Sequence, residues 1–81
     1  MGKIISVGNI PKLTKEQNRI LDEIIHGAEI QSTYENGKVV YDLVYDNGNI
    51  EVVRSDTFNR LKSTGLITLK WRPSIDIERW S

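Results

Sequence analysis

The sequence contains no cysteine and only one histidine, His26. Without cysteine the chain can form neither disulfides nor thiolate metal sites, and a zinc centre would depend almost entirely on carboxylates. His26 lies at the end of a predicted helix, where a capping or surface role is expected. The sequence also has no P-loop, GxSxG or dinucleotide-binding fingerprint. We therefore expect a protein that is not an enzyme and that holds no metal or cofactor.

Long apolar runs are missing as well. No segment approaches the roughly 20 apolar residues that a membrane-spanning helix needs, and the opening "MGKIISVG" is too short and too weakly basic for a secretory signal. A chain of 81 residues has room for one hydrophobic core. We expect a soluble, cytoplasmic protein without membrane contact, with a single domain over residues 1–81 whose flanks, residues 1–12 and 73–81, are less ordered.

An excess of either charge is also lacking, because 11 basic residues balance 11 acidic ones. The charges are nevertheless unevenly distributed. Residues 1–19 contain four basic residues and one acidic residue, residues 20–53 contain one basic and seven acidic, and residues 54–72 contain five basic and one acidic. This asymmetry, with an acidic middle between two basic flanks, indicates a charged partner.

The segment "TKEQNRILDEIIHG" predicts a helix. Thr14 and Gln17 have the spacing of a capping box, and Gly27 is the kind of residue that ends helices. Isoleucines and leucine recur at steps of three and four residues, which predicts one buried stripe. The members of that stripe are Ile20, Leu21, Ile24 and Ile25.

Three short segments rich in β-branched and aromatic residues follow: "AEIQSTY", "KVVYDLVY" and "NIEVV". Asn36-Gly37 and Asn47-Gly48 separate them, and Asn-Gly favours two-residue type I′ turns. The pattern predicts a three-stranded antiparallel meander. Strand alternation places two sets of central-strand residues on opposite faces: Val39, Tyr41, Leu43 and Tyr45 on one, and Val40, Asp42 and Val44 on the other.

The segment "RSDTFNRLKSTGLI" predicts a second helix, with Ser55 or Asp56 as the N-cap residue and Gly65 after its end. "LITLKW" then predicts a final strand in which Trp71 completes the core. The tail "SIDIERWS" is expected to pair as an edge strand or to dock through Trp80. The predicted fold class is therefore α+β: a helix, the meander, a second helix and a final strand, with the helices on one side of an antiparallel sheet.

The second predicted helix carries the most informative set of polar residues. If Phe58 and Leu61 face the core, a polar stripe faces outward. Arginine and asparagine suit bidentate recognition of guanine and adenine, whereas serine and lysine suit phosphate. The alternative is an ordinary solvated helix face. The candidate nucleic-acid contacts are Arg54, Ser55, Asn59, Arg60, Lys62 and Ser63, with Lys70 and Arg72 as additional contacts.

The segment "SDTFNRLKSTGLITL" resembles the recognition-helix segment of winged-helix proteins, in which Gly-Leu-Ile leads into a wing strand. Residues 13–69 are similar to a family of small bacterial and phage-borne winged-helix-like proteins that includes a toxin of a toxin–antitoxin pair. The resemblance implies a winged-helix-like fold and a DNA-binding or regulatory role. In place of the second helix of a typical winged helix, this sequence predicts the meander.

Two interpretations remain open from the sequence. In the first, the chain is a small winged-helix-like module that binds duplex DNA through the second helix. In the second, it is a protein-interaction module, such as a phage- or plasmid-type inhibitor or toxin that acts on a host protein through its acidic sheet or its tryptophan-bearing tail. A homodimer formed through an edge strand is compatible with both.

Overall fold

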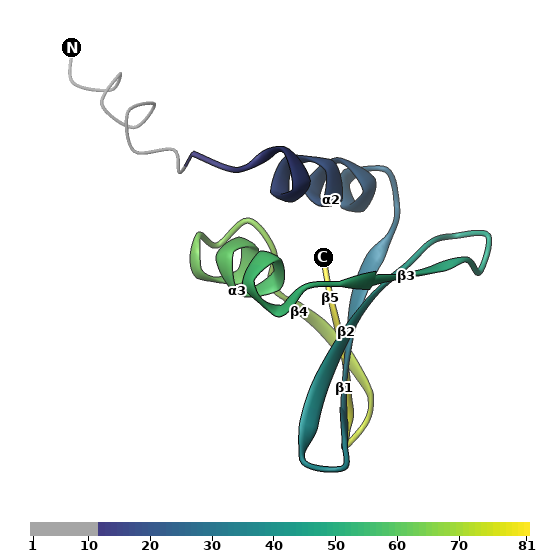
Figure 1. Cartoon of the computed structure of the whole chain (residues 1–81). Helices are drawn as coiled ribbons and strands as arrows, with labels where there is room; N and C mark the ends of the chain where they lie inside the picture. The colour runs from purple at the N-terminus through teal and green to yellow at the C-terminus, as the bar shows by residue number, and fades with distance from the viewer. Residues whose placement is uncertain (1–11) are drawn as a thin grey trace.

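A computed structural model describes residues 12–81 and contains two helices and a five-stranded antiparallel sheet in that range (Figure 1). The α+β fold class is therefore confirmed. The predicted less-ordered flank at residues 1–12 lies almost wholly outside the described residues. No helix of the described range is long and apolar enough to cross a membrane. In chain order the elements are α2 (Lys15–Ile25), β1 (Glu29–Glu35), β2 (Lys38–Val44), β3 (Ile50–Val53), α3 (Ser55–Ser63), β4 (Leu69–Ser74) and β5 (Ile77–Trp80).

Helix α2 begins with the predicted capping box. Thr14 Oγ1 accepts a hydrogen bond from the Gln17 amide (3.1 Å), and Gln17 Oε1 accepts one from the Thr14 amide (2.9 Å). Ile20 is fully buried, but Ile25 is 71% exposed, so its assignment to the core was wrong. Five residues of helix rotate a side chain by about 140° relative to the first. That rotation carries Ile25 away from the face that Ile20 buries.

The meander is present, but its two Asn-Gly turns differ. Asn36 and Gly37 both have positive φ (51° and 77°), which gives the predicted type I′ turn. In the second loop only Gly48 has positive φ (91°). Its amide donates to Tyr45 O, and the Tyr45 amide donates to Asn49 O (both 2.9 Å). This is a three-residue loop with a glycine bulge, so the prediction of a second type I′ turn was wrong.

The chain ends in a hairpin, β4–β5, and not in one final strand. The sheet order is β3-β2-β1-β5-β4, so β5 lies between β1 and β4. Residues 73–81, expected to be a less ordered flank, therefore include an interior strand of the sheet. Main-chain hydrogen bonds extend the pairing at both ends of this region, from the Tyr34 amide to Asp76 O and reciprocally between Thr68 and Ser81.

Trp80, and not Trp71, is the tryptophan that packs against the core. Leu69 pairs with Trp80, but the next paired residue of β4 is Trp71, opposite Arg79. The extra residue, Lys70, is a bulge that moves Trp71 to the face of the sheet away from the core. Trp71 is 50% exposed there, whereas Trp80 packs against the core cluster.

The core lies between the two helices and one face of the sheet. Both helices contribute to a single buried cluster, as expected for helices on one side of the sheet (Figure 1). The opposite face of the sheet carries no helix in the described part of the chain. The buried hydrophobic residues are Ile20, Ala28, Ile30, Leu43, Val53, Phe58, Leu61 and Ile67.

Candidate nucleic-acid interface

Helix α3 follows β3 after a single residue, and Arg54 is its N-cap. Arg54 has extended backbone (φ −70°, ψ 144°) and makes no side-chain capping hydrogen bond. The prediction of Ser55 or Asp56 as N-cap was therefore wrong. Asp56 instead lies in the first turn, where its Oδ1 accepts from the Thr57 amide (2.8 Å). A carboxylate in the first turn is favoured by the helix dipole, so Asp56 stabilises the helix start without capping it.

An aromatic cluster fixes the orientation of α3 on the sheet. Phe58 stacks on Tyr41 of β2, with ring centroids 4.2 Å apart, and packs perpendicular to Trp80 of β5, with ring centroids 5.2 Å apart. Leu61, one turn further along α3, is fully buried, and Thr57 is buried beside them. Because these three α3 residues occupy one side of the helix, the other side must face solvent.

The solvent side of α3 carries the residues that the sequence predicted there. Ser55, Asn59 and Ser63 are spaced four residues apart on the outer face, and all three are exposed. Arg60 and Lys62, also exposed, lie on opposite flanks of that face. The structure therefore brings together six of the eight candidate residues on one short element, since Arg54 precedes the helix directly.

Each flank of α3 contacts a different part of the chain. Arg60 Nη2 donates to the main-chain oxygen of Lys12 (3.3 Å), next to the start of α2. Lys62 Nζ lies 5.2 Å from the centroid of a Trp80 ring, a cation–π contact. Among residues 12–81, neither Arg60 nor Lys62 forms an ion pair with a carboxylate. Their charges are therefore available to an anionic ligand.

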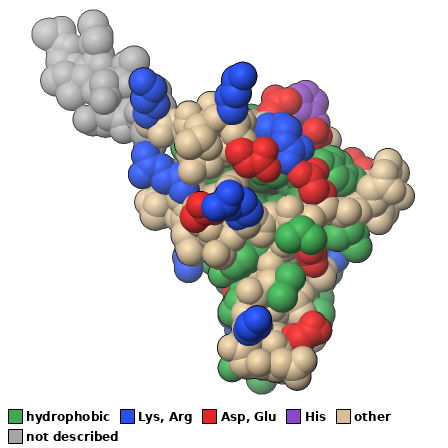
Figure 2. Space-filling model, viewed as in Figure 1, with side chains coloured by type: hydrophobic (Ala, Val, Ile, Leu, Met, Phe, Trp, Pro, Cys, Tyr) green, Lys and Arg blue, Asp and Glu red, His purple; other side chains and the backbone are tan. Residues whose placement is uncertain are grey.

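The Arg60–Lys12 contact places the start of α2 beside α3, and two further cations belong to that segment. Lys12 and Lys15 are both exposed and stand at the entrance to α2. Figure 2 shows several lysine and arginine side chains, with acidic side chains among them, at the end of the molecule where α2 begins and α3 lies. Neither lysine was among the candidate contacts. The basic composition of residues 1–19 was the signal that could have identified them.

Lys70 and Arg72 lie on β4, apart from α3. Arg72 is paired with Glu78 of the neighbouring strand, so its charge is partly used within the β4–β5 hairpin. Lys70 is the exposed bulge residue. Arg54, by contrast, belongs to the α3 surface, and its contact with Asp56 (3.3 Å) joins two largely exposed side chains. Such exposed ion pairs contribute little to the free energy of unfolding and separate readily.

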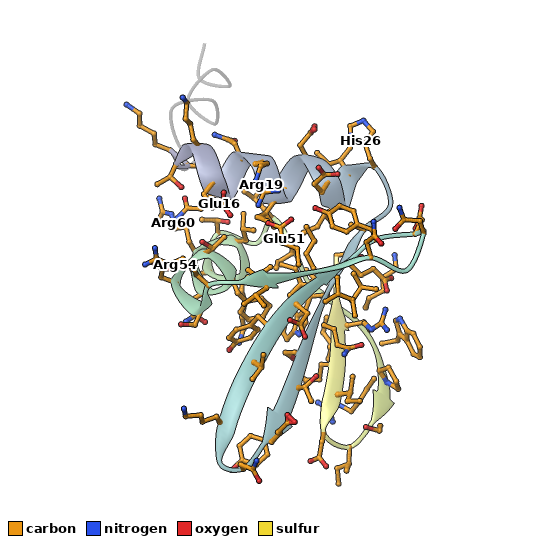
Figure 3. The ribbon with its side chains drawn as sticks, turned by 45° about the vertical axis from the view of Figure 1, so that its right-hand side comes forward. Glu16, Arg19, His26, Glu51, Arg54 and Arg60 are labelled. Atoms are coloured by element: carbon orange, nitrogen blue, oxygen red, sulfur yellow. The ribbon has the colours of Figure 1, made fainter. Side chains whose placement is uncertain are left out.

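Arg19, a further cation near this surface, is held by two carboxylates of the same chain. It donates to Glu16 of its own helix (2.9 and 3.2 Å) and to Glu51 of β3, whose carboxylate also accepts from Tyr45 Oη (2.7 Å). Figure 3 shows Arg19 between Glu16 and Glu51, while Arg54 and Arg60 lie on the side of α3. Arg19 therefore ties α2 to the sheet and is not a free ligand contact.

This cluster changes the acid–base properties of its members. Hydrogen bonds from Arg19, and then from Tyr45, hold the pKa of Glu51 below its ordinary value. Hydrogen bonds to Glu16 and Glu51 raise the pKa of Arg19. The hydrogen bond to Glu51 raises the pKa of Tyr45. The cluster is thus stable as a charged pair throughout the neutral range.

A Glu51→Gln variant is expected to lose stability at neutral pH but not in acid. The folded-state pKa of Glu51 lies below its ordinary value of 4.5, so its contribution is complete above that value and disappears as the pH falls through the folded-state pKa. The loss is small, because both side chains of the pair are partly exposed. Urea unfolding of the wild type and of Glu51→Gln, from neutral pH to below 4.5, measures this difference in the free energy of unfolding. The free energies of unfolding of the wild type and Glu51→Gln should converge as the pH falls, and a constant difference between them would contradict the assignment.

The outer face of α3 presents hydrogen-bond donors and positive charge together. The outer face combines an amide, two hydroxyls and cations on both flanks, which are groups that donate hydrogen bonds to phosphates and base edges. His26, at the C-cap of α2, is exposed at the far end of that helix (Figure 3). No family model, curated protein or solved structure matches the chain.

Proposed function

We propose that this protein is a small, non-enzymatic, winged-helix-like module that binds duplex DNA through the outer face of α3. The observation that carries the proposal is the anchoring of α3 by Phe58 and Leu61. Because those side chains are buried, Asn59, Arg60 and Lys62 must point outward together. The cations at the start of α2 extend the same surface.

Different residues of α3 would make different kinds of contact with DNA. Asn59, at the centre of the outer face, is placed to pair with an adenine edge, and Arg60 to pair with a guanine edge or a phosphate. Ser55 and Ser63 would donate hydrogen bonds to phosphates, and Arg54 and Lys62 would neutralise them. Phosphate contacts of this kind would position the helix, while Asn59 and Arg60 would provide sequence preference.

The order of elements supports the winged-helix-like assignment in part. Helix α3 is followed directly by the β4–β5 hairpin, which occupies the place that the family resemblance gives to the wing. Lys70 and Arg72, both on β4, would then contact the DNA backbone at a position separate from α3. The meander replaces the helix that normally precedes the recognition helix, so the sheet takes over its supporting role through the Tyr41–Phe58 stack.

Binding to a labelled duplex at two salt concentrations tests the proposal. We expect binding at low salt that weakens as salt rises, because each neutralised phosphate contributes about −0.9 to the slope of log K against log salt. The absence of binding at low salt would overturn the proposal. A double-stranded competitor of random sequence separates base-specific from purely electrostatic binding.

A second candidate function, as a protein-interaction module or host-directed inhibitor, is favoured by Trp71. This side chain is half exposed on the helix-free face of the sheet, and the Arg79 guanidinium lies 5.8 Å from its ring centroid. Tryptophan and arginine are the residue types most enriched at interaction hot spots. A partner protein retained by the wild type and lost with Trp71→Ala, together with no duplex binding, would favour this function over the first.

A further inference from the structure

The two edge strands of the sheet differ in how well they are protected from pairing with another chain. Strand β4 carries Pro73, Lys70 and two register irregularities, which are features that prevent an edge strand from pairing with another chain. Strand β3, at the other edge, has none of them. Its sequence is Ile-Glu-Val-Val, and it pairs with β2 in unbroken register. By this comparison β3 is the edge that remains open to pairing.

Hydrogen-bond alternation identifies which main-chain groups of β3 face outward. The Tyr45 amide donates to Asn49 O, so these two residues form a hydrogen-bonded pair at the loop. Such pairs alternate with non-hydrogen-bonded ones along an antiparallel ladder. Glu51 therefore directs its amide and carbonyl toward β2, and Ile50 and Val52 direct theirs toward the open edge. None of the described residues forms a main-chain hydrogen bond with the outward amides and carbonyls of Ile50 and Val52.

The side chains of β3 also favour pairing with another strand at this edge. Ile50 is 64% exposed and Val52 is 74% exposed, both on the helix-free face of the sheet. Glu51 points to the other face, where Arg19 of the same chain neutralises its charge. A strand with apolar side chains, outward hydrogen-bonding groups and no net repulsion is suited to pair with a copy of itself.

We propose that two copies of this chain form a symmetric dimer by antiparallel pairing of their β3 strands, with Ile50 of each copy opposite Val52 of the other. This register joins all the outward amides and carbonyls of Ile50 and Val52 in reciprocal hydrogen bonds. It places Glu51 opposite Glu51 on the two-fold axis, each held by its own Arg19. The interface is short, so the dimer is weak and concentration-dependent. The proposal stands independently of DNA binding.

Single cysteines test the register, because the natural chain contains none. A Glu51→Cys variant places two thiols opposite each other at a non-hydrogen-bonded pair, where Cα atoms are about 4.5 Å apart, within the range that a disulfide spans. We expect oxidation with glutathione disulfide to convert Glu51→Cys to a covalent dimer. Ile50→Cys and Val52→Cys should cross-link poorly alone but efficiently when the two variants are mixed.

Sedimentation of the wild-type chain over a wide range of concentration provides the companion measurement. A reversible monomer–dimer equilibrium is expected, and Val52→Lys should shift it to monomer with unchanged circular dichroism, since lysine protects an edge strand. The mixed Ile50 and Val52 cysteines keep Glu51, so they remain informative if Glu51→Cys is destabilised. A wild-type monomer at all concentrations, or equal cross-linking of every cysteine variant, would overturn the proposal.

Discussion

A Phe58→Ala variant is expected to lose most of its free energy of unfolding. Phe58 is 2% exposed, stacks on Tyr41 and packs perpendicular to Trp80, so its removal leaves a cavity between α3, β2 and β5. Phenylalanine-to-alanine changes in a core cost about 3–5 kcal/mol. Small domains have little more than about 5 kcal/mol to lose. Urea unfolding followed by circular dichroism measures the effect.

The matched control is another aromatic residue replaced by alanine on the surface. Tyr34 is 55% exposed at the end of β1, and Tyr34→Ala should cost less than about 1 kcal/mol, the range of strand propensity. Equal losses for Phe58→Ala and Tyr34→Ala would show that the aromatic cluster does not anchor α3. The outward orientation of the polar face of α3 would then have no structural basis.

The second large effect is expected on DNA binding. Replacing Arg60 and Lys62 together by alanine removes one cation from each flank of α3. Neither side chain has a carboxylate partner within residues 12–81. Loss of a bidentate arginine contact costs about 1–3 kcal/mol, and each lost phosphate contact lowers the salt slope by about one. We expect the double variant to bind duplex DNA roughly ten- to a hundredfold more weakly at fixed salt, and with a shallower salt dependence.

The control for this variant is Lys38→Ala, which removes an exposed lysine at the start of β2, away from α3. It should leave both affinity and salt slope nearly unchanged. Because Lys62 contacts Trp80, the double variant must also be compared by urea unfolding to show that it is folded at the assay temperature. Unchanged binding by a folded double variant would contradict the assignment of α3 as the DNA-binding element.

Local chemistry made part of this fold predictable from the sequence. The Thr14–Gln17 capping box and the Asn36-Gly37 turn depend on residues within a few positions of each other. The polar face of α3 was predictable for the same reason, because helical spacing alone separates Asn59 from Phe58. These features involve no contact with distant parts of the chain.

The features that sequence reasoning missed depend on distant contacts. A single bulge residue, Lys70, decides that Trp80 and not Trp71 reaches the core, and nothing in the local pattern marks a bulge there. Strand β5 forms because it fits beside β1, far earlier in the chain. The contact of Arg60 with Lys12, which enlarges the basic surface, likewise joins segments that only the folded chain brings together.

We propose that duplex DNA binds the outer face of α3 and not the acidic residues of the sheet. Amide chemical-shift mapping by NMR during titration with a short duplex tests it most directly. We predict that the largest shifts fall on residues 54–63 and on Lys12 and Lys15, with little change along β1 and β2. Shifts concentrated on the sheet, or no shifts at low salt, would contradict it.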